Sequence, residues 1–269
     1  MSDILDDWLA EDLGNGDVTS KAVVRNSLCE AEITGGPAVI SGIDLCKELF
    51  SRHNIDNNTN FSNGDRIDSK ACIFSLQGQS HDILKVERLV LNLLCHLSGI
   101  ATFTAEIVKK AKSINPNVEI LATRKTIPGL REIEKAAVVH GGGMTHRIRL
   151  DDAILIKDNH LKLCKDIRSA IKDSRRNNPD LMIEVEADNF EQALEATKSG
   201  ADRVMLDNFT PALTQETVSS LRKISGIEIE SSGGITLENV ELYAPFVDFI
   251  SLGSLTMAAP PVDFSLHVN

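Results

Sequence analysis

Residues 182–209, MIEVEADNFEQALEATKSGADRVMLDNF, contain two apolar runs on either side of a helical pattern. Met182–Ala187 and Arg203–Asp207 are predicted strands, and residues 189–198 are a predicted helix. The same rhythm continues outward, with strands at Val118–Thr123, Ala153–Lys157, Ile227–Glu230 and Phe249–Gly253 and helices at 165–176, 211–223 and 236–244. This alternation predicts a parallel α/β sheet or barrel. The six strands, with a weaker seventh near Gly143–His146, fall short of eight, so an incomplete barrel is expected.

Residues 1 to about 85 have a different character. Apolar residues recur at helical spacing from Ile4 to Leu13, and the turn signal GNGD at 14–17 ends that helix. Short strands are predicted at Ala31–Ile33 and Ala38–Ile40, and an alternating strand follows the turn at 63–65. This α+β pattern is antiparallel in character. Two helices are expected next, one from residue 86 to Gly99 and one over 102–113, and a domain boundary is expected between 88 and 105.

Composition narrows the class of protein. The formal net charge is -11, which disfavours attraction to nucleic acid. Apolar content of 42% and charge of 25% are those of a folded soluble protein, and no uninterrupted apolar run approaches membrane-spanning length. The acidic start lacks the features of a secretory signal. Five widely spaced cysteines without a CxxC pair predict reduced thiols, no zinc site and a cytoplasmic location.

Cations concentrate in one segment of this acidic chain. From Arg124 to Arg149 there are six Arg or Lys and only two acids, Glu132 and Glu134. Three consecutive glycines at 141–143 and His146 lie in the same segment. This pattern predicts a pocket for a small polyanion, because Arg pairs bidentately with carboxylates and phosphates and Lys acts as a point charge.

Polar residues follow nearly every predicted strand. The carboxyl ends of barrel strands carry the active site, so these residues are expected to converge, although any one of them could be a solvated strand end or a helix cap. The cationic set is Arg124, Lys125, His146, Arg147 and Lys157. Glu186 and Asp207 form an acidic set that suits Mg²⁺, ribose hydroxyls or a developing positive charge. Loops at 232–234 and 253–254 are candidates for phosphate binding, whereas GxGxxG and P-loop motifs are absent.

Several of these segments resemble one family. TRKTIPGLREIEKAAVVHGGG (123–143), THRIRLDDAILIKDNH (145–160), EVEADNFEQA (184–193), VMLDNF (204–209) and ESSGGITLENVELYA (230–244) are similar to the quinolinate phosphoribosyltransferases, the carboxylating nicotinate-nucleotide pyrophosphorylases. EDLGNGDVTS (11–20) and VERLVLNLLCHLSGIAT (86–102) resemble the family as well. The similarity runs from about residue 5 to the C-terminus, and its most specific parts are TRKTIPGLR and LIKDNH.

The resemblance implies a reaction and a fold. Quinolinate and phosphoribosyl pyrophosphate would give nicotinate mononucleotide, pyrophosphate and CO₂, with Mg²⁺, in NAD biosynthesis. Residues 1–100 would form an N-terminal α/β sandwich and residues 101–254 an incomplete seven-stranded (β/α) barrel. Residues 255–269 would pack back onto the first domain. A cytoplasmic homodimer with its sites near the interface is implied.

The resemblance also implies roles for particular residues. Arg124, His146, Arg147 and Lys157 would hold the two quinolinate carboxylates, and Arg88 would reach in from the partner subunit. Lys125 would contact the pyrophosphate end, and Glu186 and Asp207 would hold ribose hydroxyls or, indirectly, metal. The catalytic candidates are Lys125, Lys157, Glu186 and Asp207. The remaining substrate-binding candidates, most of them for the 5′-phosphate, are Thr123, Ser232, Gly233, Gly234, Leu252, Gly253 and Ser254.

Two departures from the family pattern keep alternatives open. Thr145 stands where the family usually has Asn, and Met257 stands where it usually has His. One alternative is the paralogous branch associated with molybdate-transport operons, which would use a different substrate and tends to lose the KDNH motif that is intact here at 157–160. Met257 motivates a second, a non-catalytic ligand-binding homologue. A third is a Schiff-base lyase with Lys157 as the amine nucleophile.

Overall fold

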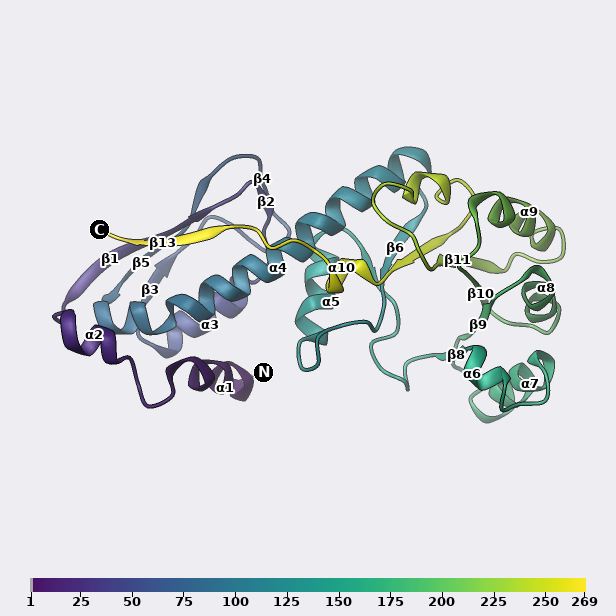
Figure 1. Ribbon diagram of the computed structural model, residues 1–269, viewed down its shortest axis with the longest axis horizontal. Coiled ribbons are helices and arrows are strands. Elements are labelled where there is room, and N and C mark those ends of the chain that lie inside the picture. The colour runs from purple at the N-terminus through teal and green to yellow at the C-terminus, as the bar shows by residue number, and fades with distance from the viewer. Residues whose placement is uncertain (1) are drawn as a thin grey trace. The chain divides into compact units, whose positions relative to one another are not determined.

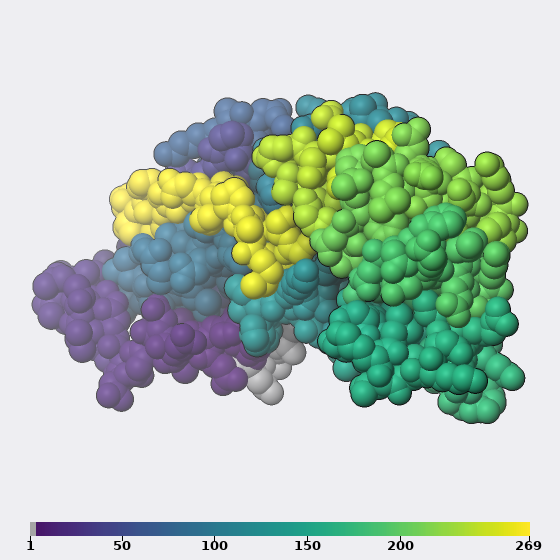
Figure 2. Space-filling model, turned by 45° about the vertical axis from the view of Figure 1, so that its right-hand side comes forward, coloured from purple at the N-terminus to yellow at the C-terminus, as the bar shows by residue number. Residues whose placement is uncertain are grey.

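The computed structural model describes residues 2–269, and the chain divides into two compact units (Figure 1). The first contains the residues up to Phe103 together with Val139–Gly142 and Ala259–Asn269. The second contains Thr104–Val138 and Gly143–Ala258. The C-terminal segment, yellow in Figure 2, belongs to the first unit, where β13 (Phe264–Val268) pairs with β1 (Leu28–Gly35).

The first unit is built on a four-stranded antiparallel sheet. Its order is β13-β1-β5-β3, with β5 at Ala71–Gln79 and β3 at Asp56–Asn58. Alternate residues of β1, such as Ala31 and Ile33, are buried against the helices, as the period of two predicts. A short pair, β2 (Ala38–Val39) and β4 (Arg66–Ile67), completes the strands. The helices are α1 (Ser2–Leu13), α2 (Val18–Val23), α3 (Ile43–Arg52) and the first part of α4 (Ser80–Ile114).

Helix α4 is one continuous helix of 35 residues, so the expectation of two helices separated near Gly99 was wrong. Gly99 serves close packing instead, because a Cβ there would lie 2.4 Å from the Pro260 carbonyl oxygen. By length and composition α4 could cross a membrane, which the sequence prediction did not anticipate. Of its most apolar window, 61% is buried inside the structure, as in the core helix of a folded protein.

The second unit contains a seven-stranded sheet in the order β7-β6-β12-β11-β10-β9-β8, and neighbouring strands within it are parallel. The strands are β6 (Glu119–Ala122), β7 (Met144–Thr145), β8 (Ile154–Ile156), β9 (Ile183–Ala187), β10 (Arg203–Asp207), β11 (Glu228–Ser232) and β12 (Phe249–Leu252). All six predicted strands are present, and the seventh is β7. The sheet curls into a half-barrel with β7 and β8 at its two edges, which confirms the incomplete barrel.

Helices connect most of these strands, and one more follows the last of them, β12. They are α5 (Arg131–His140), α6 (Asp158–Leu161), α7 (Ile167–Asn177), α8 (Phe190–Lys198), α9 (Pro211–Leu221) and α10 (Ser254–Met257). Asp166, Asn189 and Thr210 cap α7, α8 and α9 through their side chains. The predicted helix over 236–244 is only a 3₁₀ turn, η1 (Val240–Leu242). Asn239 accepts from the Thr236 amide and donates to the Gly234 carbonyl, and such local bonds compete with a helix.

Candidate active site

A cavity of about 390 Å³ lies in the second unit, among residues at the carboxyl ends of the parallel strands. Its walls come from seven strands or the residues that directly follow them. The lining residues are Thr123, Arg124, Lys125, His146, Arg147, Leu155, Lys157, Glu186, Met205, Asp207, Ser232 and Ser251. Side chains from residues more than 120 positions apart therefore meet around one space.

Most of the predicted site residues reach this cavity. All five cations and both acids line it, together with Thr123 and Ser232. The other residues of the two glycine loops, Gly233, Gly234, Leu252, Gly253 and Ser254, are not among its lining residues. Arg88 lies exposed on α4 in the first unit. The binding roles of all these residues stay predictions.

Two guanidinium groups face the cavity close to each other. Burial lowers the pKa of Arg147, and the charge of Arg124 lowers it further. Arg147 Nη1 donates to the Ala153 carbonyl at 3.1 Å. The Nε atom of Arg124 is buried and finds no hydrogen-bond partner among the described residues. Two neighbouring cations, one with an unused buried donor, form a site suited to an anion with paired oxygens.

The acids lie at the ends of β9 and β10. Lys157 Nζ donates to Glu186 Oε2, so one cation is already paired with one acid. Burial raises the pKa of Asp207, and the neighbouring Glu186 carboxylate raises it further. The cavity therefore has an arginine-rich part and a part with two adjacent carboxylates.

Hydrogen bonds hold the backbone of Lys125, and a neighbouring glycine leaves room for its side chain. Its amide donates to Thr123 Oγ1 at 3.0 Å, and its carbonyl accepts from Thr256 Oγ1. A Cβ added to Gly253 would lie 2.7 Å from Lys125 Cδ, so this glycine leaves room for the lysine stem. Gly253 thus acts on the cavity through Lys125, although it does not line the cavity itself.

The comparisons with known proteins agree with this geometry. Residues 17–98 match the model of the quinolinate phosphoribosyl transferase N-terminal domain, and residues 100–267 match that of the C-terminal domain. The chain belongs to the quinolinate phosphoribosyltransferase family.

Relatives and solved structures cover nearly the whole chain. The human nicotinate-nucleotide pyrophosphorylase (carboxylating) is 32% identical over 100% of this chain and 91% of that protein. A protein of Methanothermobacter thermautotrophicus named "Probable nicotinate-nucleotide pyrophosphorylase (carboxylating)" is 37% identical over 100% of this chain and 99% of its own length. The structure of the nicotinate-nucleotide pyrophosphorylase from Francisella tularensis is 34% identical, with a TM-score of 0.93, and the match covers 99% of this chain and 95% of that one.

The two departures from the pattern of the quinolinate phosphoribosyltransferase family lie outside the cavity lining. Thr145 is an exposed residue of β7. The Met257 residue is 57% exposed at the end of α10. Neither side chain is among those that line the cavity, and their effect on substrate choice stays open to test.

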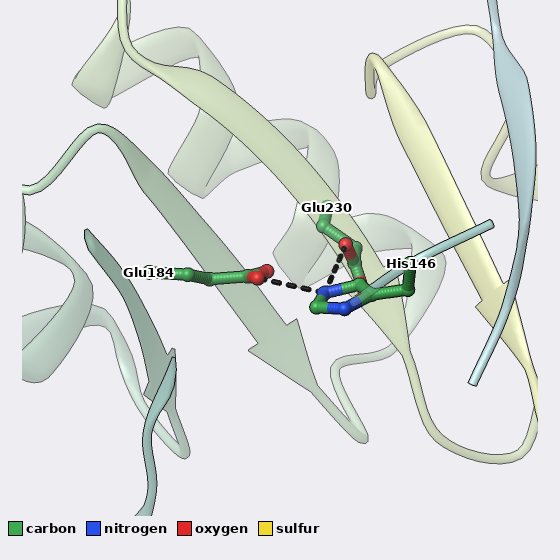
Figure 3. Close-up of side chains that lie close together, drawn as sticks. All are labelled: His146, Glu184 and Glu230. Atoms are coloured by element: carbon green, nitrogen blue, oxygen red, sulfur yellow. Dashed lines mark hydrogen bonds and ion pairs between the residues drawn. The ribbon is translucent and has the colours of Figure 1, made fainter. Parts of the chain in front are cut away.

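Beneath the cavity of this family member lies a buried group that the sequence prediction missed (Figure 3). His146 Nε2 lies 2.8 Å from Glu184 Oε2 and 3.6 Å from Glu230 Oε2. Both glutamates are 0% exposed. Burial raises the pKa of Glu184 to about 7 and that of Glu230 to about 8. Two adjacent buried carboxyl groups repel each other when both are ionised, so they share a proton near neutral pH.

These three side chains are close enough together to hold a metal ion. The hydrogen bonds of the ring argue against it. His146 Nδ1 accepts the Arg147 N–H at 2.7 Å, so Nδ1 carries no proton. A neutral imidazole then carries its proton on Nε2, the atom that faces the glutamates, and a protonated Nε2 cannot ligate a metal. The network therefore assigns a hydrogen bond from Nε2–H to Glu184 in place of a metal bond.

The period of the strands could have predicted the missed residues. Side chains two positions apart on a strand point to the same face, so Glu184 shares the inner face with Glu186, and Glu230 shares it with Ser232. Ser251, on β12, lines the cavity and donates to Glu230 Oε1. The positions of these two deeper glutamates were thus readable from the alternation, whereas the contact between His146, which follows β7, and Glu184 of β9 was not.

Proposed function

We propose that this chain is a carboxylating nicotinate-nucleotide pyrophosphorylase that acts in NAD biosynthesis. It would transfer the phosphoribosyl group of phosphoribosyl pyrophosphate to the ring nitrogen of quinolinate. Pyrophosphate leaves, the C2 carboxylate is lost as CO₂, and C2 takes up a proton to give nicotinate mononucleotide. Family membership supports this reaction, and the geometry of the cavity supports the assignment of its residues.

The observation that carries the proposal is the pair Arg124 and Arg147 at one cavity wall. Quinolinate bears two adjacent carboxylates, and two guanidinium groups supply donors in the planar geometry that carboxylates accept. Lys125 adds a cation beside Gly253, where we place the pyrophosphate of the second substrate.

The acids serve the ribosyl centre. As the bond to pyrophosphate breaks, positive charge develops on the ribose, and the carboxylates of Glu186 and Asp207 stabilise it. Loss of CO₂ then leaves an electron pair at C2. The pyridinium charge stabilises that pair, and nearby Arg147 and Lys157 add to the stabilisation in a partly buried cavity.

The same two carboxylates suit Mg²⁺ carried by phosphoribosyl pyrophosphate. The pKa of Asp207 is raised by burial and then by Glu186, and a divalent cation would relieve that repulsion. Carboxylate oxygens are the hard donors that Mg²⁺ prefers, directly or through water. When bound, the ion would neutralise charge on the departing pyrophosphate.

A product assay tests the reaction. Protein, Mg²⁺, quinolinate and phosphoribosyl pyrophosphate should yield nicotinate mononucleotide and CO₂. Arg124→Ala should lower kcat/KM by roughly 10- to 150-fold, because one charge-assisted clamp contributes roughly 1.5–3 kcal/mol. Arg168→Ala, an exposed arginine of α7 outside the cavity lining, is the matched control and should leave turnover unchanged. Binding of both substrates without product would reject the enzyme and favour a ligand-binding homologue.

We also propose a homodimer in which Arg88 of one subunit serves the site of the other. Arg88 is an exposed cation on α4, available to a second copy. Light scattering measures the mass. Mixing inactive Arg88→Ala with inactive Lys157→Ala should restore about a quarter of the activity, since half the dimers are mixed and each has one complete site. If Arg88 served its own subunit's site, the mixture would stay inactive.

The alternatives are separable from this proposal. A Schiff-base lyase requires a neutral amine, whereas Lys157 is held in an ion pair with Glu186. Borohydride trapping with a carbonyl substrate should therefore give no adduct. The molybdate-operon branch would show phosphoribosyl transfer to a different acceptor than quinolinate. The cytoplasmic location remains a prediction that cell fractionation checks.

A further inference from the structure

We propose that His146 is a positioning residue that fixes Arg147, and that it does not bind a substrate carboxylate as a cation. Glu184 and Glu230 hold its ring from inside the half-barrel (Figure 3). This inference rests on the proposed function, since the carboxylate that Arg147 would meet is that of quinolinate.

The first argument is that both ring nitrogens of His146 are already engaged. Nδ1 accepts the backbone N–H of Arg147 at 2.7 Å, and Nε2 donates to Glu184 Oε2 at 2.8 Å. The imidazole has no nitrogen left for a ligand in the cavity. The ring can therefore affect a bound substrate only through the groups to which it is hydrogen-bonded. The one that belongs to a cavity residue is the backbone N–H of Arg147.

The second argument is that Arg147 is fixed at three further points. Buried Lys135 donates from Nζ to the carbonyl oxygens of His146 and Arg147, each at 2.8 Å. Arg147 Nη1 donates to the Ala153 carbonyl at 3.1 Å. The carbonyl groups of His146 and Arg147 and the guanidinium group of Arg147 are therefore all hydrogen-bonded to other residues of the chain. The peptide between residues 146 and 147 is thus held at both polar ends, with its carbonyl oxygen accepting from Lys135 and its N–H donating to the His146 ring.

The charges around His146 favour a neutral ring. Burial lowers the pKa of His146. Two acids and three cations face the ring. The acids are Glu184 of β9 and Glu230 of β11. The cations are Lys135 of α5, Arg203 of β10 and the adjacent Arg147. Arg203 Nη1 also lies 3.5 Å from Glu230 Oε2, so it offsets part of the attraction that would charge the ring. Quinolinate binding should then not follow the titration of an imidazole.

The decisive measurement is ¹⁵N NMR of the full chain with labelled histidine, which separates protonated from unprotonated ring nitrogens. The chain has seven histidines, and His146 is assigned by the signal that disappears in His146→Gln. We expect one proton, on Nε2, from pH 5.5 to 8, with and without quinolinate. A doubly protonated ring in the quinolinate complex, or a proton on Nδ1, would overturn the proposal. This readout needs no turnover, so it fails or succeeds independently of the proposed reaction.

Two variants provide a kinetic test. In His146→Asn the side-chain oxygen lies near the former Nδ1 and can still accept from the Arg147 amide, whereas His146→Leu cannot accept. We expect the quinolinate KM of His146→Asn to stay within about threefold of that of the unmodified chain. The His146→Leu KM should rise about tenfold or more, because a displaced clamp loses alignment. Equal KM losses in both variants, with circular dichroism showing folded protein, would contradict positioning and indicate direct binding.

Discussion

Replacement of Glu230 by Gln should remove a large pH dependence of stability. The carboxyl group is 0% exposed, and its pKa is raised from 4.5 to about 8, first by burial and then by Glu184. Between these values the folded state keeps a proton that the unfolded state releases. The contribution of this group to stability is therefore present below pH 4.5 and lost as the pH rises towards 8. The loss approaches about 1.4 kcal/mol per pH unit well below pH 8 and flattens near pH 8, which gives roughly 2–3 kcal/mol from pH 5.5 to 7.5. An amide does not titrate, so Glu230→Gln should not show that loss.

Urea unfolding followed by far-UV circular dichroism at pH 5.5, 6.5 and 7.5 measures the difference. The free energy of unfolding of the unmodified chain should fall relative to that of Glu230→Gln as the pH rises. Glu132→Gln is the matched control, because the Glu132 side chain is 64% exposed and pairs with Arg149 on the surface. Its effect should stay within about 0.5 kcal/mol at every pH. If the free energy of unfolding changed with pH by the same amount in the unmodified chain and in Glu230→Gln, the shared-proton assignment would be refuted.

Three further results are expected. Lys135→Met should lower the free energy of unfolding by about 3 kcal/mol in urea titrations, because a buried and a partly buried carbonyl oxygen lose their donor; an unchanged unfolding midpoint would show that Lys135 does not anchor this segment. Gly253→Ala should leave stability within about 0.5 kcal/mol, since the Gly253 φ of -71° suits alanine. It should raise the KM for phosphoribosyl pyrophosphate severalfold, because the added Cβ displaces Lys125; an unchanged KM would separate Lys125 from that substrate. Chelation of Mg²⁺ should abolish product formation, and added Mg²⁺ should restore it; full activity in chelator would remove the metal from the proposal.

Much of the site was predictable because parallel strands place their carboxyl ends at one edge of a sheet. Arg124 follows β6, Lys157 follows β8, and Asp207 ends β10, so locating the strands located their side chains. The strands themselves were found because their apolar middles mark a sheet covered on both faces. This reasoning needed no knowledge of contacts across the half-barrel.

The parts of the site and fold that were not predicted depend on contacts between distant residues, which no local sequence pattern encodes. His146 was counted among the cations, yet its ring is turned inward between β9 and β11 (Figure 3). A histidine beside an arginine looks the same in sequence whether its partner is a substrate or a buried glutamate. Two helices were expected on either side of Gly99 and residue 102, whereas one helix runs through them and Gly99 packs closely against Pro260.

The inner carboxyl groups also bear on how the cavity binds anions. Four fixed cations line it, Arg124, Lys125, Arg147 and Lys157, and Glu186 is already paired with one of them. If Glu184 and Glu230 were both ionised beneath these cations, they would offset much of the positive field that two polyanionic substrates require. A shared proton removes one negative charge from the interior and leaves a hydrogen-bond acceptor for His146. The half-barrel can thus anchor the residue before Arg147 with acids while its cavity keeps a net positive charge.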